Sequence, residues 1–290
     1  MVIDCHYHLE QRLLPLDKML ARMDAAGVDR TALMAVVTEP IREPSKTLVC
    51  LLRVLLARDF SRWLGRRLIE KFDAKGNVVI LGRSYRTYTH PDNGPVFDLV
   101  RRQPDRFLGW AFVRPGSGVD PVAEMERWAG TSGFVGVKAH PFWHRYEPLQ
   151  LLPIARKLIP LGKPLLIHAG FGPHGNFFPL LESAPGLKLI IAHAGFPGYS
   201  ETLRQIRPYK NVTVDLSQTS YVGEAATCRA VEALGCERCL YGTDGPYGFR
   251  DAHGAFDYGF LKSRLERLFP DPGVRRRLMS DNFADLAGIV

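Results

Sequence analysis

Two histidines near the start of the chain have the spacing of metal ligands. His6 and His8 stand in the run Asp4-Cys5-His6-Tyr7-His8, inside a short apolar segment. Because successive side chains of a strand point to opposite faces, both imidazoles would project from the same face of a strand. Four later strand-like segments also end in metal-binding or ionisable residues, namely Lys138, His168, His193 and Asp244. Together these side chains could form a buried site for a divalent cation.

A buried cluster of this kind needs a compensating charge. Any one buried histidine can be an ordinary core residue with satisfied hydrogen bonds. Burying several ionisable groups in one dry place is costly, however, unless a metal ion makes the same cluster favourable. The agreement of five strand ends therefore favours a metal centre over unrelated core residues.

The segments that carry these residues alternate between strand-like and helical patterns. Nearly continuous apolar runs, typical of strands buried on both faces, occupy residues 2–9, 31–37, 107–113, 134–140, 164–170, 188–195, 212–217 and 239–244. Eight repeats of strand and helix predict an α/β fold, the (β/α)8 TIM barrel, in which the carboxyl ends of the strands converge. The rival is a doubly wound open sheet, but no Gly-x-Gly-x-x-Gly follows any predicted strand.

The interval 39–106 is too long for a single connection of such a barrel. We expect one domain over residues 1–290, with 39–106 as an insertion after the second strand. Long connections of this kind commonly carry a lid, an interface or specificity. The insertion contains arginines at spacings of four or five that predict a basic helix face: Arg53, Arg58, Arg62 and Arg66. A solvated face explains them most simply, with a lid, a subunit interface or a membrane-surface contact as alternatives.

The composition limits the kinds of partner. The chain has 290 residues, of which 46% are hydrophobic and 23% charged, as in an ordinary globular protein. Its formal charge of +8 indicates an anionic substrate or surface, and no recognised nucleic-acid-binding motif accompanies that charge. The most apolar helical stretch, 48–57, is too short to span a bilayer, and the first residues lack a signal-peptide pattern. We therefore expect a cytoplasmic protein with neither a transmembrane segment nor a nucleic-acid partner.

Six motifs, in their order along the chain, resemble those of a known superfamily. They are Asp4–His8, Gly136–Pro141, Ile167–Gly170, Ala192–Gly195, Asn211–Asp215 and Tyr241–Pro246. With them the chain resembles the amidohydrolase superfamily, and more closely its branch of TIM-barrel metal-dependent hydrolases related to aminocarboxymuconate semialdehyde decarboxylase. The resemblance runs from residue 4 to Asn282-Phe283-Ala284. The motifs are specific for fold and metal site but not for reaction, because the branch includes hydrolases, decarboxylases, lactonases and hydratases.

The resemblance implies one divalent ion, Zn²⁺ in the first place and Mn²⁺ as the alternative, bound by His6, His8, His168 and Asp244. Three imidazoles and a carboxylate leave a position for water, as a catalytic site requires. Asp244 would also take the proton of that water, and His193 would act as general acid or base beside the substrate oxygen.

A second arrangement stays open at Lys138. In binuclear members of the superfamily a lysine at this place is carboxylated and bridges two metals, with the histidines corresponding to His168 and His193 on the second ion. Lys138 could equally remain an ammonium that holds a substrate oxyanion. His140 shares the face of Lys138 and is a candidate for a further metal or substrate contact, or a structural histidine beside a turn.

Two arginines are candidates for binding the substrate. Arginine forks bind carboxylates, so Arg83 and Arg114 are candidate contacts to a small anionic substrate. Our first hypothesis is hydrolysis of an amide, ester or lactone by metal-activated water. The alternatives are a metal-dependent decarboxylase of an aromatic or unsaturated acid, and an inactive barrel that serves as a binding protein. We expect the insertion to contribute to substrate binding or to a homodimer contact.

Overall fold

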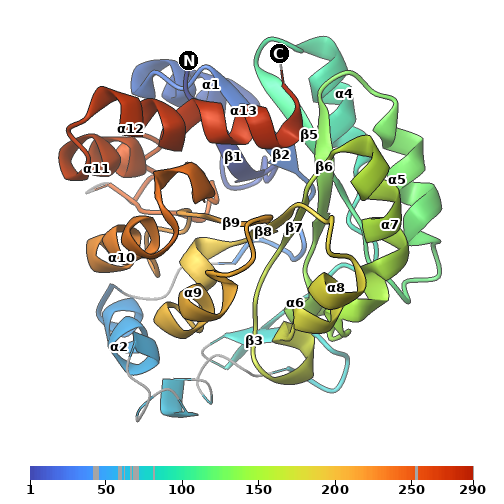
Figure 1. Cartoon of the computed structure of the whole chain (residues 1–290). Coiled ribbons are helices and arrows are strands. Elements are labelled where there is room, and N and C mark those ends of the chain that lie inside the picture. Colours follow the sequence, from blue (N-terminus) through green and yellow to red (C-terminus); the bar gives the residue numbers. More distant parts are fainter. Residues whose placement is uncertain are drawn as a thin grey trace.

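The computed structural model describes residues 1–41, 46–57, 61, 63–65, 67, 72–80, 82–251 and 254–289. Its centre is a barrel of eight strands surrounded by helices (Figure 1). In order around the barrel these are β1 (Ile3–His8), β2 (Arg30–Met34), β5 (Phe107–Phe112), β6 (Phe134–Ala139), β7 (Leu165–Ile167), β8 (Leu189–Ile191), β9 (Val212–Asp215) and β10 (Cys239–Leu240). All neighbouring pairs are parallel. The prediction of a (β/α)8 barrel is therefore confirmed.

Backbone hydrogen bonds close the barrel between its last and first strands. The amide of Cys5 donates to the carbonyl of Tyr241 at 3.0 Å. Beyond β10, the amide of Asp244 donates to the carbonyl of His6 at 2.8 Å, and the amide of His8 donates to that of Gly245 at 2.7 Å. The segment after β10 is thus held against β1, and this places Asp244 beside the two histidines.

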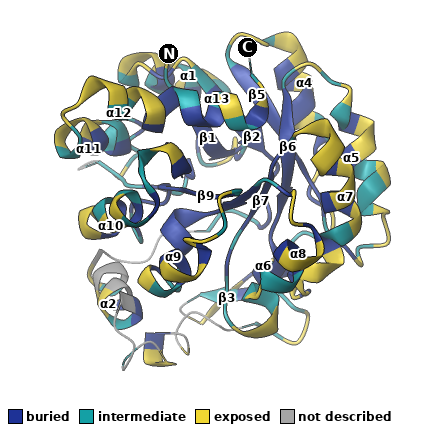
Figure 2. Ribbon diagram, in the orientation of Figure 1, coloured by how far each residue is buried: buried dark blue, intermediate teal, exposed yellow. Residues whose placement is uncertain are grey.

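Helices cover the outside of the barrel, with their outer faces exposed and the strands buried (Figure 2). They are α1 (Leu16–Ala26), α4 (Gly94–Arg102), α5 (Pro121–Ala129), α6 (Pro141–His144), α7 (Leu152–Leu161), α8 (Phe178–Ser183), α9 (Ser200–Ile206), α10 (Glu224–Leu234), α11 (Phe260–Leu268), α12 (Pro272–Arg276) and α13 (Asn282–Ala287). Their ends carry ordinary signals. Helix α1 stops at Gly27, whose φ of +62° suits glycine, and α5 begins after Asp120, whose side chain accepts from the amide of Val122.

Short helical turns lie in several of the connections. They are η1 (Pro148–Leu151), η2 (Gly172–Gly175), η3 (His193–Gly195), η4 (Cys236–Arg238) and η5 (Arg277–Asp281). Of these, η3 follows β8 after one residue, Ala192, and starts with His193, so it sets the direction of that side chain.

The buried core has two layers that alternate along each strand. The layer inside the barrel contains Ile3, Cys5, Ala32, Met34, Leu108, Trp110, Val135, Leu166, Ile190, Ala192 and Leu240. Phe283 and Ala287 of α13 join this layer, and the ring of Phe283 lies 5.9 Å from that of Trp110. The layer between strands and helices includes Leu33, Ala111, Val137, Ile167, Ile191 and Val214. Branched and aromatic side chains therefore fill the barrel below its carboxyl end.

This alternation decides which side chains at the strand ends face inward. In β6 the pairing with β5 shifts between Gly109 and Trp110, so Val135 packs inside the barrel, Val137 packs outside it, and Lys138 faces inward. In β1 the pairing with β2 shifts between Asp4 and Tyr7. Tyr7 packs in the outer layer, and His6 and His8 on either side of it consequently face the interior.

The interval 39–106 combines an added segment with a regular barrel helix. Between β2 and α4 lie α2 (Lys46–Ala57) and an antiparallel hairpin of β3 (Val78–Ile80) and β4 (Arg83–Tyr85). Helix α4 itself packs on β5, where the lack of a side chain at Gly109 lets the ring of Phe97 approach closely. We propose that the insertion proper ends before α4.

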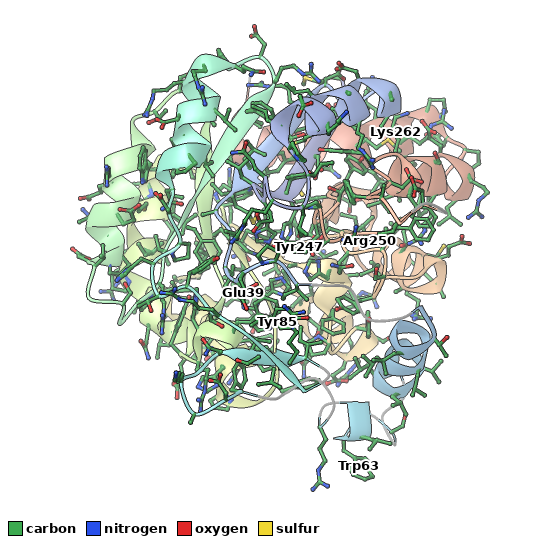
Figure 3. The ribbon with its side chains drawn as sticks, turned by 180° about the vertical axis from the view of Figure 1, so that it is seen from behind. Glu39, Trp63, Tyr85, Tyr247, Arg250 and Lys262 are labelled. Carbon is green, nitrogen blue, oxygen red and sulfur yellow. The ribbon has the colours of Figure 1, made fainter. Side chains whose placement is uncertain are left out.

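The added segment extends from the barrel towards the edge of the molecule. Trp63 lies at the periphery with 58% of its surface exposed, whereas Tyr85 lies centrally in the same view (Figure 3). The predicted basic face lies outside what the structure describes: Arg58, Arg62 and Arg66 are not among the described residues, nor is the side chain of Arg53. Among the described helices, none combines the length and the apolar character needed to cross a membrane.

Candidate metal centre

Five imidazoles and a carboxylate meet at the carboxyl end of the barrel. They belong to His6, His8, His140, His168, His193 and Asp244. Nε2 of His6 lies 3.2 Å from Oδ1 of Asp244, and Nε2 of His8 lies 3.4 Å from the same oxygen. Nε2 of His168 lies 2.8 Å from Nε2 of His193, which is 3.9 Å from Oδ2 of Asp244. The structure thus brings the predicted metal-binding and catalytic residues into one cluster.

Hydrogen bonds at Nδ1 turn three of these imidazoles so that Nε2 faces the cluster. Nδ1 of His6 lies 2.9 Å from Oδ2 of Asp215, and Nδ1 of His8 lies 3.1 Å from the carbonyl oxygen of Ala35. Nδ1 of His193 lies 2.7 Å from the hydroxyl of Ser217. Such partners behind a metal-binding imidazole fix its tautomer and its orientation.

Asp215 is the part of the site that we did not assign from the sequence. Its Oδ1 accepts hydrogen bonds from the amides of His193 and Ser217, both at 3.0 Å, and from the hydroxyl of Ser217. Burial acts to raise the pKa of Asp215, but the imidazoles of His6 and His193 hold it well below its usual range. Asp215 is therefore a buried anion that orients two histidines at once. In the sequence, Asp215 ends the motif Asn211–Asp215, which contributes to the family resemblance but does not indicate what this residue does.

Asp244 is held as a carboxylate in the centre of the cluster. Burial opposes its charge, yet the imidazoles of His193 and His6 keep its pKa well below the usual value. Its Oδ2 accepts a hydrogen bond of 2.8 Å from the side-chain amide of Gln218. Asp244 and His193 both have positive φ, +57° and +58°. Such backbone strain in residues other than glycine concentrates at functional sites.

Lys138 lies beneath the cluster without a hydrogen-bond partner. Its side chain is completely buried, and Nζ makes no hydrogen bond to any described residue. Burial lowers the pKa of Lys138 to about 8, although the charges of Asp215 and Asp244 act in the opposite direction. A substantial neutral fraction is therefore present near pH 8, and only the neutral amine can react with CO2.

His140 is stacked between two rings at the wall of the cluster. Its ring centroid lies 4.1 Å from that of His168 and 4.7 Å from that of Trp143. Its Nδ1 accepts a hydrogen bond of 3.1 Å from the amide of Trp143. Burial first, and then the charge of Lys138, lowers the pKa of His140 well below the usual value. The ring is therefore neutral with its proton on Nε2, and it supports one face of His168.

The donor set fits a divalent metal ion. Since the carbonyl of Ala35 and the carboxylate of Asp215 can only accept, His8 and His6 carry protons on Nδ1, and in the neutral form each imidazole directs a lone pair from Nε2 at Oδ1 of Asp244. Three lone pairs that converge in a buried space repel one another unless a positive charge lies among them. Atoms bound to one zinc ion are about 3.3 Å apart, close to the separations found here. Nε2 of His6 accordingly has no hydrogen-bond partner among the described residues.

Two overlapping triads could each hold an ion. One consists of His6, His8 and Asp244, and the other of His6, His168 and His193. Imidazole and carboxylate ligands suit zinc and manganese alike. The arrangement is compatible with one ion, or with two if Lys138 is carboxylated.

Two cavities that share lining residues open onto the cluster, with volumes of about 110 and 180 Å³. His140, His168 and His193 line both of them. The insertion contributes an apolar wall made of Ile41, Leu48, Leu52, Val78 and Ile80, and further apolar surface comes from Trp143, Phe142, Phe171 and Phe196. Tyr247, in the loop after β10, also lines the smaller cavity and lies near the centre of the view in Figure 3.

The two arginines predicted as substrate contacts are not in the lining of these cavities. Arg83 is an exposed residue of β4, with its guanidinium 5.2 Å from the ring of Tyr85. Arg114 lines a different cavity, between α4 and α5. No arginine or lysine among the described residues lines either cavity at the cluster.

His144, beside Arg114, gives the protein a testable pH dependence of stability. Burial and the charge of Arg114 lower its pKa to about 3, from an ordinary value of 6.5. The unfolded chain therefore binds a proton more readily, so stability is lost as the pH falls from 6.5 towards 3. At pH 5 the loss due to His144 is about 2 kcal/mol. We predict that urea unfolding at pH 7 and pH 5 gives a smaller difference for His144→Gln than for the wild type, whereas equal differences would contradict the assignment.

Comparisons with known proteins agree with this geometry. Residues 73–287 match the model of the Amidohydrolase family. A search of curated proteins gives no significant match. A solved structure of 2,6-dihydroxybenzoate decarboxylase from Rhizobium is similar over 99% of this chain and 98% of its own, with a TM-score of 0.61 and 15% identity. A putative 2-pyrone-4,6-dicarboxylic acid hydrolase from Pseudomonas putida is similar over 99% and 97%, with a TM-score of 0.61 and 20% identity.

A further similar structure contains a metal. It is a 5-carboxyvanillate decarboxylase variant from Novosphingobium aromaticivorans with bound manganese and a nitrobenzoic acid, similar over 93% of this chain and 80% of its own. The TM-score is 0.58 and the identity 18%. These likenesses confirm the barrel, and the family match covers most of the chain. The chain belongs to the amidohydrolase family, as its motifs predicted.

Proposed function

We propose that the protein is a metal-dependent hydrolase that cleaves an ester, lactone or amide bond of a small substrate with an apolar or aromatic body. The observation that carries this proposal is the position of Asp244, whose carboxylate lies among the imidazoles of His6, His8 and His193 at the end of an apolar cavity. An ionised carboxylate can accept the proton of an attacking water. It is a poor acid for delivering a proton to carbon, as decarboxylation requires.

We assign the metal ligands as His6, His8, His168 and Asp244, with Zn²⁺ or Mn²⁺ as the ion. When bound, the ion supplies a Lewis acid that polarises the scissile carbonyl and makes water more acidic. A second ion would require a carboxylated Lys138. What supports a second ion is that His193 also lies in ligand range of His6 and that Nζ of Lys138 has no partner among described residues.

The chain's own groups provide the proton path. The hydroxyl of Ser217 donates to Asp215, so it accepts from Nδ1 of His193, and the neutral His193 keeps a lone pair at Nε2. Burial lowers the pKa of His193 to about 4, so this neutral form dominates at pH 7. Asp244 takes a proton from water, and His193, 3.9 Å away, carries it to the leaving group through one intervening water.

The cavity indicates the shape of the substrate. Its apolar wall suits a ring or a short hydrocarbon, and Gln218, Thr38 and Tyr221 add polar groups near the cluster. Since no described arginine or lysine lines it, an anionic group of the substrate would be held at the metal end. The similar structures are named for aromatic or pyrone carboxylic acids, and such an acid fits this division into a polar end and an apolar end.

A decarboxylase is the second candidate. An apolar cavity strips water from a carboxylate, and that favours loss of CO2. Two of the three similar structures described above are decarboxylases by name. The same ligand set would then orient an aromatic acid, and a protonated side chain would have to supply the proton to carbon.

Isotope incorporation distinguishes the two reactions. The zinc- or manganese-loaded protein is incubated with a panel of aryl esters, aryl lactones, anilides and hydroxybenzoic acids, once in H2¹⁸O and once in D2O. Hydrolysis places one ¹⁸O in the acid product and releases no CO2. Release of CO2 with one deuterium on a product carbon and no ¹⁸O would establish decarboxylation instead. Metal-loaded protein that turns over no member of the panel would favour an inactive binding protein.

A further inference from the structure

A third cavity, of about 250 Å³, lies beside the end of β5 between the starts of α4 and α5. It shares no lining residue with the two cavities at the metal cluster. Its lining includes Arg114, Arg127, His90 and Ser117. It therefore gathers two guanidinium groups and an imidazole at a place that the proposed hydrolysis does not use.

Among the described residues, the guanidinium groups in this cavity have no anionic partner. Nε of Arg114 is buried and makes no hydrogen bond to a described residue. In the part of the chain that the structure describes, neither Arg114 nor Arg127 forms an ion pair with a carboxylate. Arg127 instead lies over the ring of Trp128, 4.8 Å from its centroid. A half-buried guanidinium without a counter-charge is unfavourable, and an anion in the cavity would relieve that cost.

The carboxylates in the lining are engaged elsewhere. Oδ1 of Asp92 accepts from the amide of Gly94 at 2.9 Å. Oε1 of Glu124 accepts from the side-chain amide of Asn93 at 2.7 Å and from the indole of Trp128 at 2.8 Å. Both acids thus accept hydrogen bonds from neutral donors, and in the described part of the chain neither forms an ion pair with Arg114 or Arg127.

The positions of the helices add to the positive potential. Gly94 begins α4 and Pro121 begins α5, and both residues line the cavity. The amino-terminal end of a helix carries a partial positive charge that favours anions. Two helix amino termini and two arginines therefore give this cavity a positive potential that favours a small oxyanion.

We propose that this cavity is a binding site for a small oxyanion, a phosphate or a carboxylate, with Arg114 and Arg127 as its principal ligands. Guanidinium groups bind both kinds of anion through paired hydrogen bonds. The site is separate from the metal cluster and does not depend on which reaction that cluster performs. Arg114, first considered as a contact for the catalytic substrate, is the centre of this second site.

Calorimetric titration of the metal-loaded protein with inorganic phosphate, and separately with malonate, tests the proposal. We expect Arg114→Gln to weaken binding of the preferred anion by about 10-fold and Arg127→Gln by about 3-fold. Arg156→Gln, which removes an exposed arginine of α7, is the matched control and should bind as the wild type does. Tighter binding of phosphate or of malonate identifies the natural class of anion, and thermal unfolding checks that each variant is folded.

Either of two results would overturn the site. One is equal affinity of Arg114→Gln, Arg127→Gln and Arg156→Gln for both anions. The other is binding that a chelator abolishes while Arg114→Gln leaves it unchanged, because the anion would then lie at the metal cluster. Arg127 is an exposed side chain, so its variant decides the question even if Arg114→Gln does not fold.

Discussion

Replacement of Asp244 by Asn is expected to lower kcat by about 10³, within the range found on removal of a positioned acid or base. The amide has nearly the same size but cannot accept the proton of water. Oδ1 of Asp244 also faces Nε2 of both His6 and His8, so the change should weaken metal binding as well. Activity must therefore be measured at saturating metal, where the loss in kcat reflects the missing base.

Asp285→Asn is the matched control for this variant. Asp285 is an exposed carboxylate of α13 that pairs with Arg277 at 3.2 Å. It belongs to neither ligand triad. We expect its kcat to equal that of the wild type. If Asp244→Asn at saturating metal retains more than about a tenth of the wild-type kcat, Asp244 is not the general base.

His6→Ala is expected to reduce the metal content from about one ion per chain to nearly none, and to abolish turnover with it. His6 is completely buried and belongs to both ligand triads, so no arrangement of the site survives its removal. The far-ultraviolet circular dichroism should change little, because side-chain packing within and around the barrel holds the strands. Elemental analysis of protein prepared without chelators provides the measurement.

His174→Ala serves as the control for metal content. His174 lies in η2 and belongs to neither ligand triad. A His6→Ala protein that is folded and still binds one equivalent of zinc would show that the ion sits elsewhere. Equal loss of metal in His168→Asn and His193→Asn would favour two ions bridged by a carboxylated Lys138.

The sequence predicted the barrel and the members of the cluster for the same physical reason. Buried parallel strands alternate with period two, and their carboxyl ends meet at one rim. The parity of β7 places His168 inward, on the face of Leu166. Two local irregularities escape this reasoning. In β6 the pairing with β5 shifts between Gly109 and Trp110, and this shift lets Lys138 face inward although Val135, three residues before it, does so too. The shift in pairing between Asp4 and Tyr7 lets Cys5 pack inside the barrel without turning His6 and His8 away from the site.

The partners behind the ligands could not be predicted from spacing. Asp215 contacts His6 across 209 positions of the chain, and Ser217 contacts His193 across 24. Nothing in the local pattern around β9 distinguishes an orienting carboxylate from a ligand. Only the assembled barrel shows that Asp215 lies behind the imidazoles.

For the insertion, the sequence did not predict which side chains face the cavity. The insertion contains Arg83, a candidate substrate contact, yet its described part offers Ile41, Leu48, Leu52 and Ile80 to the cavity while Arg83 is exposed. Net charge reports the composition of a segment but not which of its faces is turned inward. Ile80 and Arg83 are paired across the hairpin and share one of its faces, yet the guanidinium of Arg83 lies over the ring of Tyr85, 5.2 Å from its centroid, and does not line the cavity.

Anomalous diffraction at the zinc edge, from crystals of protein prepared without chelators and supplied with zinc, tests the central claim most directly. We predict a peak among Nε2 of His6, Nε2 of His8, Nε2 of His168 and the carboxylate of Asp244. A second peak bridged through Lys138 would extend the site to two ions. A well-ordered barrel without an anomalous peak at these four residues would contradict the account of a metal-dependent hydrolase.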